Sequence, residues 1–485
     1  GIFIVSSDIA RTVGSAGWLL AVWLFSGLVT LLAAACYGEL SAMMPQAGGQ
    51  YVYLREIYNP LVGFLFGWTL FMVIQTGSIA AVGMAFAKYT AVLIPAVSES
   101  NVLFTVGPLA VNAAQVLAIA SIAFLTWVNT TGLREGKIVQ DVFTLTKAGA
   151  LLGLVALGLL LGRNPQALAA NFRDFWAASR VSVGPDGSVV REALSGLPLL
   201  MALGAASVGS LFACDAWNNV TFTAGETRDP RRTVTRALVL GVVVVGVLYL
   251  LANVAYLVAL PVQGLPDAAD TLGRGMQFAV DDRVGTAAAW TILGPVAAIV
   301  MAVFIMIATF GCNNGMILTG ARVYWAMARD GLFFRRCGAL NKRAVPGVAL
   351  AAQGLWSCAL CLTGKYGDLL DYVIFSVLIF YALTIVGIFV LRRRLPHAER
   401  PYKAPGYPVL PALYVLAAFA ICVDLLIVKP RYTWPGLVIV ALGVPVVPIV
   451  ARTGEGTELL LDAVARLCTE RVREHWRPLW LDYGD

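Results

Sequence analysis

A lysine stands in the middle of a long apolar run, where its charge would meet hydrocarbon unless it had a partner. The run extends from Ile138 to Leu161, and Lys147 lies well inside it. At about 1.5 Å of rise per residue, its α-carbon would lie roughly 14 Å inside the membrane edge. That depth is near the midplane of a hydrocarbon core about 30 Å thick. We expect such a cation to face a polar cavity or a partner and to serve function; the alternative is a side chain that snorkels to the surface.

Two other segments are interrupted inside the predicted membrane. One starts at Gly1 and Ile2, and the other covers residues 204–226, which begin apolar and become polar. Broken helices at matching positions in two halves mark the binding site of transporters with inverted repeats. Free amides at a half-helix N-terminus suit a carboxylate, and free carbonyls at a C-terminus suit an ammonium group. A zwitterionic amino acid would match both.

The composition predicts a helical protein that crosses the membrane many times. The 485 residues are 59% hydrophobic and only 13% charged, with a net charge of +7. A basic chain could suggest nucleic acid, but 23 of the 35 Lys and Arg residues fall in one alternating set of loops. This pattern follows the positive-inside rule and predicts a cell-membrane protein with a cytoplasmic C-terminus.

The hydropathy pattern predicts a transmembrane domain over residues 1–451 and a cytoplasmic tail over 452–485. The tail has the spacing of an interfacial amphipathic helix. The chain is expected to begin partway through its first transmembrane helix, which makes twelve helices when the missing half is counted. The predicted spans are 1–7 (a half helix), 18–44, 60–92, 110–129, 138–162, 193–222, 236–260, 286–319, 346–364, 367–392, 408–428 and 434–451.

Cysteine and histidine usage indicates neither disulfides nor a metal site. Each of the eight cysteines falls within a span or in a segment placed on the cytoplasmic side. The only two histidines, His397 and His475, lie in basic polar segments. We therefore expect no metal and no cofactor. A membrane enzyme is disfavoured because no catalytic cluster is visible.

Several dispersed motifs together resemble the L-type amino acid transporters of the amino acid–polyamine–organocation superfamily. The resemblance runs to about residue 450 and implies an all-α polytopic fold with a five-plus-five inverted repeat and broken helices 1 and 6. The motifs are Gly1-Ile-Phe, Cys36-Tyr-Gly-Glu39-Leu, Pro45-Gln-Ala-Gly48-Gly49-Gln-Tyr51, Val139-Gln-Asp-Val-Phe143 with Lys147, Phe212-Ala-Cys-Asp215-Ala-Trp217-Asn218, Gly225-Glu226-Thr-Arg-Asp229-Pro230-Arg-Arg232, Gly311-Cys-Asn-Asn314-Gly315 and Ala328-Arg-Asp-Gly331.

The resemblance implies a sodium-independent exchanger of L-amino acids, in a prokaryotic member, that works by alternating access. Lys147 would occupy the place of a coupling ion and bridge helix 1 to helix 8. Its helix 8 partner would be Asn313 or Asn314. Two alternatives remain: a proton-coupled symporter of the same superfamily, and an amino acid sensor that does not transport.

The same resemblance places the substrate at the two helix breaks. Gly1 and Ile2 would supply amides for the carboxylate. In helix 6, Ala213 and Cys214 lie in the break, Phe212 would act as a gating aromatic, and Trp217 and Asn218 would shape the site. Each of the three larger side chains could instead be ordinary packing.

Asp215 departs from the many family members that have glycine at this position. Its carboxylate would favour a substrate with an amine-bearing side chain. Alternatively it caps free backbone amides near the break, or serves as a proton site in a symporter.

Four further residues have expected supporting roles. Gln75 and Thr76 should line the cavity wall, or form a polar pair between helices. Glu39 and Glu226, near the cytoplasmic face and close to arginines, are candidates for the inner gate, or simply solvated charges.

A covalent heavy-chain partner is not expected. Animal L-type transporters bond to a single-span glycoprotein through an exterior cysteine between helices 3 and 4. The corresponding loop here, residues 95–104, has no cysteine. The expected partners are therefore the amino acid substrates and the lipid bilayer, without nucleic acid.

Overall fold

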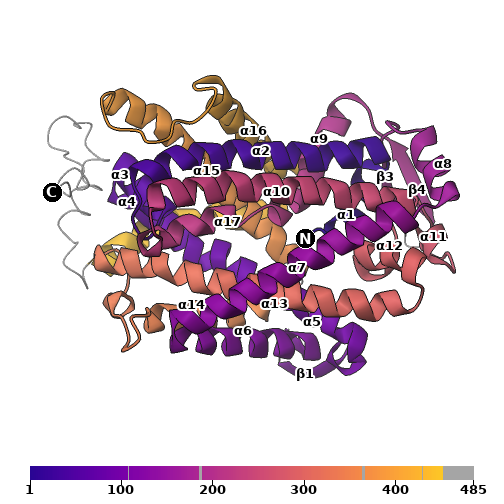
Figure 1. Ribbon diagram of the computed structural model, residues 1–485, viewed down its shortest axis with the longest axis horizontal. Coiled ribbons are helices and arrows are strands. Elements are labelled where there is room, and N and C mark those ends of the chain that lie inside the picture. The colour runs from indigo at the N-terminus through magenta and orange to yellow at the C-terminus, as the bar shows by residue number, and fades with distance from the viewer. Residues whose placement is uncertain (107–108, 185–187, 363–365, 429, 452–485) are drawn as a thin grey trace.

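The computed structural model describes residues 1–106, 109–184, 188–362, 366–428 and 430–451. Long helices run side by side along the longest axis of the molecule (Figure 1). Within these ranges nine helices are long and apolar enough to cross a membrane, and three shorter apolar helices accompany them. The prediction of an all-α polytopic protein is confirmed, whereas the predicted tail over 452–485 lies outside the described residues.

The long helices are joined by short helices and two small hairpins. The helices of 15 residues or more are α2 (Ala16–Met43), α5 (Gln75–Leu93), α6 (Ala113–Thr131), α7 (Leu133–Leu161), α9 (Gly196–Ala213), α10 (Pro230–Ala259), α13 (Val296–Arg329), α14 (Gly347–Cys361), α15 (Tyr366–Arg394), α16 (Val409–Val428) and α17 (Pro430–Ala451). The shorter ones are α1 (Val5–Val13), α3 (Gln50–Ile57), α4 (Pro60–Thr69), α8 (Pro165–Arg173), α11 (Thr271–Arg274) and α12 (Val284–Leu293). The 3-10 helices are η2 (Pro95–Val97), η3 (Trp217–Glu226), η4 (Val280–Asp282) and η5 (Arg335–Gly338), and η1 (Leu70–Ile74) is a π-helix. Strands β1 (Val102–Val106) and β2 (Leu109–Asn112) form one antiparallel hairpin, and β3 (Ser179–Val183) and β4 (Val189–Ala193) form the other.

The third membrane crossing is a continuous rod built from α4, η1 and α5. It begins where the Asn59 side chain accepts a hydrogen bond from the amide of Val62, with Pro60 at the first helical position. Both features favour a helix start. The π-turn of η1 widens the helix by one residue just before Gln75, and such bulges often occur at functional sites.

The helices pack in pairs that lie five crossings apart. Helix α1 packs on α9, α2 on α10, α5 on α13, and α6 on α14. Counting α4, η1 and α5 as one crossing, each of the first four crossings therefore contacts the one five places later. This is the pairing that two halves related by a pseudo-twofold axis would produce.

The predicted interruption after α9 is present, while the other predicted interruption falls at the first residues of the chain. Residues 2–4 form a turn in which the Gly1 carbonyl accepts hydrogen bonds from the amides of Ile4 and Val5, both at 2.9 Å. The helix proper is therefore Val5–Val13, not residues 1–7. Helix α9 ends at Ala213, and Ala216 has a left-handed backbone (φ 62°) before η3 begins.

A third interruption contradicts the predicted unbroken span over 286–319. The chain forms α12 and then α13, separated at Gly294 and Pro295. Gly294 adopts a φ of 58°, which favours glycine, and proline cannot continue the preceding helix. The hydropathy window could not detect this break because both helices are apolar.

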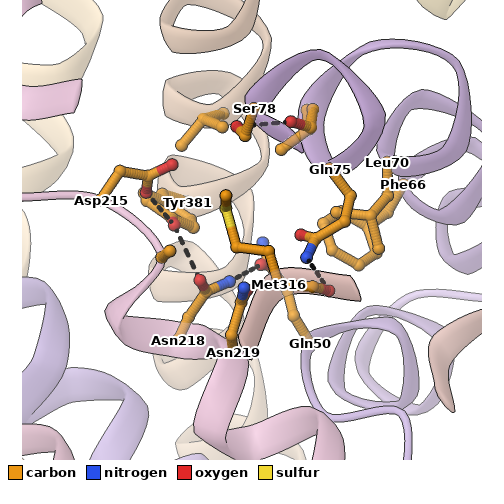
Figure 2. A pocket seen from close by; sticks show the side chains of 13 residues that line it. Gln50, Phe66, Leu70, Gln75, Ser78, Asp215, Asn218, Asn219, Met316 and Tyr381 are labelled. Carbon is orange, nitrogen blue, oxygen red and sulfur yellow. Dashed lines mark hydrogen bonds between the residues drawn. The ribbon is translucent and has the colours of Figure 1, made fainter. Parts of the chain in front are cut away.

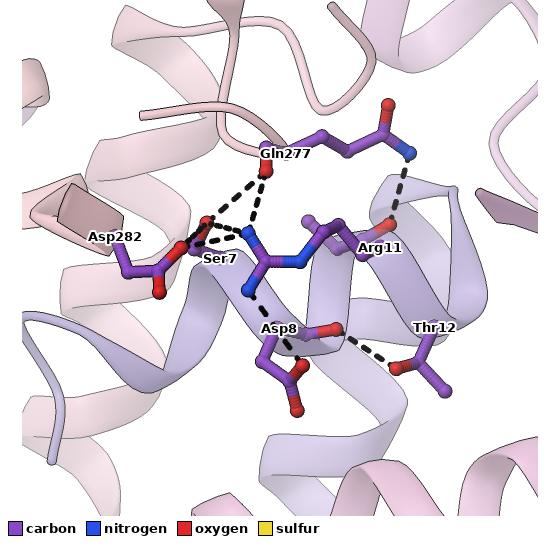
Figure 3. Close-up of polar contacts among 7 residues, drawn as sticks. Ser7, Asp8, Arg11, Thr12, Gln277 and Asp282 are labelled. Carbon is purple, nitrogen blue, oxygen red and sulfur yellow. Dashed lines mark hydrogen bonds and ion pairs between the residues drawn. The ribbon is translucent and has the colours of Figure 1, made fainter. Parts of the chain in front are cut away.

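Helices α8 and α11 and strands β3 and β4 lie at one end of the molecule (Figure 1). At this end, polar contacts join α1 to the segment that precedes α12 (Figure 3). The Arg11 guanidinium pairs with Asp282 at 2.7 Å and donates to the Gln277 carbonyl at 2.9 Å. The Ser7 hydroxyl also donates to Asp282, and the Gln277 side chain donates to the Ala10 carbonyl. The amide of Gly285 reaches the Phe3 carbonyl at 3.2 Å.

At the opposite end, a buried carboxylate joins α2 to α15. Glu39 is only 1% exposed and accepts two hydrogen bonds from Arg392, at 2.6 and 3.0 Å. It also accepts one from the Ala404 amide at 2.7 Å, and the Nε of Arg400 lies 3.4 Å away. The carboxylate therefore holds three separate chain segments together.

We predict that Glu39→Ala destabilises the protein by about 1–3 kcal/mol, because it leaves the partly buried guanidinium groups of Arg392 and Arg400 and the Ala404 amide without their acceptor. The measurement is the free energy of unfolding in mixed micelles. Glu399→Ala is the matched control, since Glu399 is exposed and forms no ion pair in the described part of the chain. That control should shift stability by less than about 0.5 kcal/mol, and equal effects in the two variants would contradict the prediction.

Candidate functional site

The break after α9 opens onto a cavity at the centre of the bundle (Figure 2). Three of the predicted site residues line it: Asp215, Asn218 and Gln75. The rest of the lining comes from α3, α4, η1, α5, α13 and α15: Gln50, Phe66, Leu70, Ile74, Ser78, Ala216, Asn219, Met316, Val377 and Tyr381. A polar segment from a broken helix thus faces a wall that mixes apolar side chains with amide and hydroxyl groups.

A chain of polar side chains runs from the break to α3 and α15. The Tyr381 hydroxyl lies 2.7 Å from Asp215 Oδ1 and 3.1 Å from Asn218 Oδ1. The Asn218 amide donates to Gln50 Oε1 at 3.0 Å, and the Gln50 amide donates to the Thr384 hydroxyl at 3.0 Å. Except for Asp215, which faces the cavity, these side chains are buried.

A second cavity shares Asp215 and Tyr381 with the first and adds Trp217. Its other walls come from α2, α9, α15 and α16. Beside it the rings of Tyr37, Trp217 and Tyr381 contact one another, with centroid separations of 4.8, 5.2 and 5.8 Å. Trp217 therefore combines a packing role with a place on a cavity wall.

The remaining predicted residues of the two breaks lie together in a separate apolar contact between α1 and α9. Ile2 and Cys214 are buried there, and Ala213 packs against the same cluster. Gly1 lies so close to α9 that an added Cβ would come within 2.4 Å of the Ala213 Cβ. Glycine is required at this approach, because any side chain would separate the two breaks.

Two predicted site residues, the wall residue Thr76 and the gating aromatic Phe212, do not line either cavity described above. Thr76 is fully buried, and its hydroxyl donates to the Phe71 carbonyl in its own helix at 2.6 Å. Phe212 is half-buried and packs against the core cluster of the bundle. Gln75 does line the first cavity, but its amide is fixed by the Met316 carbonyl at 2.8 Å. Gln75 therefore lies on a cavity wall in the structure and Thr76 does not, and a role of either residue at the substrate stays a prediction.

Lys147 lies half-buried on α7, which packs against α13. It forms no hydrogen bond or ion pair with another residue that the structure describes. Asn314 is fully buried, and its Oδ1 accepts a hydrogen bond from Asn129 of α6 at 2.9 Å. Asn313 is also buried, and its Oδ1 lacks a partner among the described residues. The bridge from Lys147 to helix 8 stays a prediction.

The two inner-gate candidates lie at the end of the molecule opposite the Arg11 contacts. Glu39 is the buried carboxylate bound by Arg392. Glu226, at the end of η3, pairs with Arg322 of α13 at 3.2 Å; the Glu226 side chain is 43% exposed and that of Arg322 only 3%. Both glutamates therefore pair with arginines of other helices, Glu39 in a buried position and Glu226 in an exposed one, and their role as an inner gate stays a prediction.

Sequence reasoning did not identify Tyr381 and Gln50 as site residues. Gln50 belongs to a motif quoted above, but nothing local indicates that it faces Asn218. Tyr381 lies in an apolar helix that also carries Ser376 and Thr384, and this polar spacing was the only available signal. Their roles depend on contacts that join distant parts of the chain.

The arrangement can bind a polar ligand but offers no obvious covalent chemistry. Among the residues that the structure describes, no group of three or more His, Cys, Asp and Glu side chains could hold a metal ion. A carboxylate at a helix break, beside hydroxyl and amide groups in an otherwise apolar cavity, is suited to orient a small charged molecule.

Comparison with known proteins gives consistent matches over almost the whole chain. The profile of a family described as amino acid permease matches residues 1–449. The b(0,+)-type amino acid transporter 1 of Mus musculus is 28% identical over 436 residues, covering 90% of this chain and 80% of the relative. The Asc-type amino acid transporter 1 of Mus musculus is 29% identical over 450 residues, covering 92% and 77%. The large neutral amino acids transporter small subunit 2 of Mus musculus is 30% identical over 447 residues, covering 92% and 76%.

We predict that Asn218 and Gln50 are energetically coupled. Asn218→Ala and Gln50→Ala should each destabilise the protein, while a double-mutant cycle should give an interaction energy of about 0.5–3 kcal/mol. The measurement is again unfolding in mixed micelles. Asn219→Ala provides the control cycle with Gln50→Ala, because Asn219 lines the same cavity without a side-chain hydrogen bond to a described residue. Additivity to within about 0.5 kcal/mol in both cycles would contradict the coupling.

Proposed function

The chain belongs to the amino acid permease family, and on that premise we propose that it exchanges L-amino acids across the membrane without sodium. Members of this family are transporters and not enzymes, and the apolar helices mark a multi-pass membrane protein. We extend the proposal to a cytoplasmic C-terminus and to function without a disulfide-linked heavy chain. The first extension follows from the Lys and Arg distribution, and the second from the cysteine-free loop at residues 95–104.

The substrates we propose are neutral amino acids and amino acids with a cationic side chain. The observation that carries this proposal is the Asp215 carboxylate, which faces two cavities at the helix break and forms no ion pair in the described part of the chain. A carboxylate without a cation in a site of low dielectric attracts a cationic ligand strongly. The relatives named for b(0,+)-type, Asc-type and large neutral amino acid transport are similarly distant from this chain, so identity alone does not choose between substrate classes.

Lys147 supports the sodium-independent part of the proposal. Its half-buried ammonium lies on α7 without a protein partner among the described residues, and α7 packs on α13. A fixed cation at this depth can take the place of a coupling ion, because its hydrogen-bond donors suit the free carbonyls of a broken helix. A carrier with such an internal cation needs no bound sodium to complete its cavity.

Exchange is tested by uptake of labelled amino acids into sodium-free proteoliposomes. We expect uptake into vesicles loaded with unlabelled amino acid and little uptake into empty ones, because the empty carrier should not reorient readily. Faster uptake into empty vesicles under an inward proton gradient would instead establish symport. Saturable binding without any flux would identify a sensor.

The role of Asp215 is tested by changing its charge with little change of shape. Asp215→Asn should lower the arginine-to-leucine uptake ratio by about ten- to a thousandfold, the range set by one charge pair at 4 Å in media of intermediate dielectric constant. Asp424→Asn is the matched control, because Asp424 is another carboxylate on a membrane helix, α16. Its Oδ2 lies against Gly204, and it does not line either of the two cavities described above. Equal ratios in the wild type and both variants would exclude a specificity role for Asp215.

A further inference from the structure

In the direction that the hydrogen bonds take in the structure, the polar chain at the helix break contains one proton too few if Asp215 is ionised. The Tyr381 hydroxyl has a single proton, yet oxygen atoms of Asp215 and Asn218 both lie within hydrogen-bond distance, at 2.7 and 3.1 Å. A hydroxyl can donate to only one of them. One of these two contacts therefore lacks a proton unless a second donor is supplied.

In the direction that the chain takes in the structure, the second donor must be Asp215 itself. The amide of Asn218 is used to donate to Gln50, and the amide of Gln50 is used to donate to Thr384. The Thr384 hydroxyl in turn donates to a carbonyl of its own helix, at 2.7 Å. Every donor beyond Tyr381 thus points away from Asp215, and a protonated Asp215 that donates to the Tyr381 oxygen completes the chain.

The opposite direction suits an ionised Asp215. When both amides turn over, Thr384 donates to Gln50 and Gln50 donates to Asn218. Asn218 then donates to the Tyr381 oxygen, and the Tyr381 proton is free for the carboxylate. Both directions use the same heavy-atom positions, because amide oxygen and nitrogen atoms differ little in size. The chain therefore has two complete arrangements that differ by one proton at Asp215.

Among the residues that the structure describes, no cationic side chain lies beside Asp215. The titratable groups that face it are Tyr37 from α2, Cys214 from α9, Tyr381 from α15 and Tyr414 from α16. The α4, η1, α5 and α13 walls of the first cavity contribute apolar or amide and hydroxyl side chains. All four facing groups are weak acids that are ordinarily neutral at pH 7. An ionised Asp215 is hydrogen bonded by Tyr381 and by the Ala216 amide, and a cationic ligand would supply the opposite charge that none of the described side chains around it carries.

We propose that Asp215 carries a proton when a neutral amino acid occupies the site and releases it when a cationic amino acid binds. The inference rests on the proposed exchange of both substrate classes. In one cycle a cationic amino acid enters as its side chain displaces the Asp215 proton to the outer solution. A neutral amino acid then leaves together with a proton that Asp215 takes from the inner solution. The net reaction moves one cationic amino acid inward and one neutral amino acid plus one proton outward, and no net charge crosses the membrane.

The test is the steady-state accumulation of arginine by leucine-loaded proteoliposomes, which does not depend on how the transporter is oriented. The membrane potential is clamped with potassium and valinomycin, and the internal pH is set independently. We expect arginine accumulation to rise about tenfold per unit of internal acidification relative to the outside, as one coupled proton requires. Accumulation should not respond to the potential.

Two results would overturn the inference, and they differ in what else they overturn. In the first, an interior-negative potential of 100 mV raises arginine accumulation about 50-fold, which is the factor for one uncompensated charge, and pH has no effect. The proposed proton displacement is then wrong, while the proposed exchange stands. If arginine does not accumulate at all while leucine exchanges for leucine, the cationic part of the proposed function is also wrong.

A variant remote from the carboxylate tests the hydrogen-bond chain itself. Glutamate at position 50 can only accept from Asn218 and Thr384, so Gln50→Glu favours the direction that needs a protonated Asp215. The arginine-to-leucine uptake ratio should therefore fall at least tenfold. Gln75→Glu is the control, because it adds the same charge to the wall of the same cavity but lies outside the chain. An equal fall in both variants would show that charge alone acts and would overturn the role of the chain.

Discussion

The interruption of a helix inside the membrane is the constraint on which the rest of this structure depends. Backbone groups in hydrocarbon must be hydrogen bonded within the protein, so a break is tolerated only where it is buried in protein or lines a cavity. After α9 the chain passes through a left-handed residue, Ala216, and continues as a 3-10 helix. Helices α3, α5, α13 and α15 line the cavity beside this segment, and α3 and α15 supply hydrogen-bond partners for its side chains.

The environment of the break is different on its two sides. Toward α1, Gly1 and Ala213 make a close apolar contact that leaves no space for a side chain. Toward α15, the break presents Asp215 and Asn218 to a chain of hydroxyl and amide groups. One side thus holds the two broken helices together, while the other offers polar groups to a ligand. This division explains why the predicted site residues separate into two groups.

Polar clusters also join the bundle at its two ends, and they differ in burial. The Arg11–Asp282 pair is partly exposed, with side-chain exposures of 29% and 39%, whereas Glu39 is almost fully enclosed by arginines. Exposed pairs contribute little net stability, and a buried carboxylate with several donors is costly to separate from them. The contacts of α1 near Arg11 are therefore easier to open than the junction at Glu39, which is better suited to hold α2 and α15 as one unit.

The sequence by itself determined the features that local patterns encode. Apolar runs of sufficient length predict membrane helices, and the polar stretch after Gly204 predicts the second break, because both depend only on neighbouring residues. Asp215 and Asn218 are named through the resemblance of the motif that contains them, which is also read from neighbouring residues. Short-range patterns failed where two apolar helices meet at Gly294, since hydropathy does not change there.

Only the tertiary structure decided which side chains meet. Tyr381 reaches Asp215 from 166 positions away, and Gln50 reaches Asn218 from 168. Asn314 pairs with Asn129, and Gly1 approaches Ala213, in contacts that no spacing rule anticipates. The physical reason is that a hydrogen bond in a packed interior depends on how helices cross and rotate. That arrangement is a property of the whole bundle and not of any one segment.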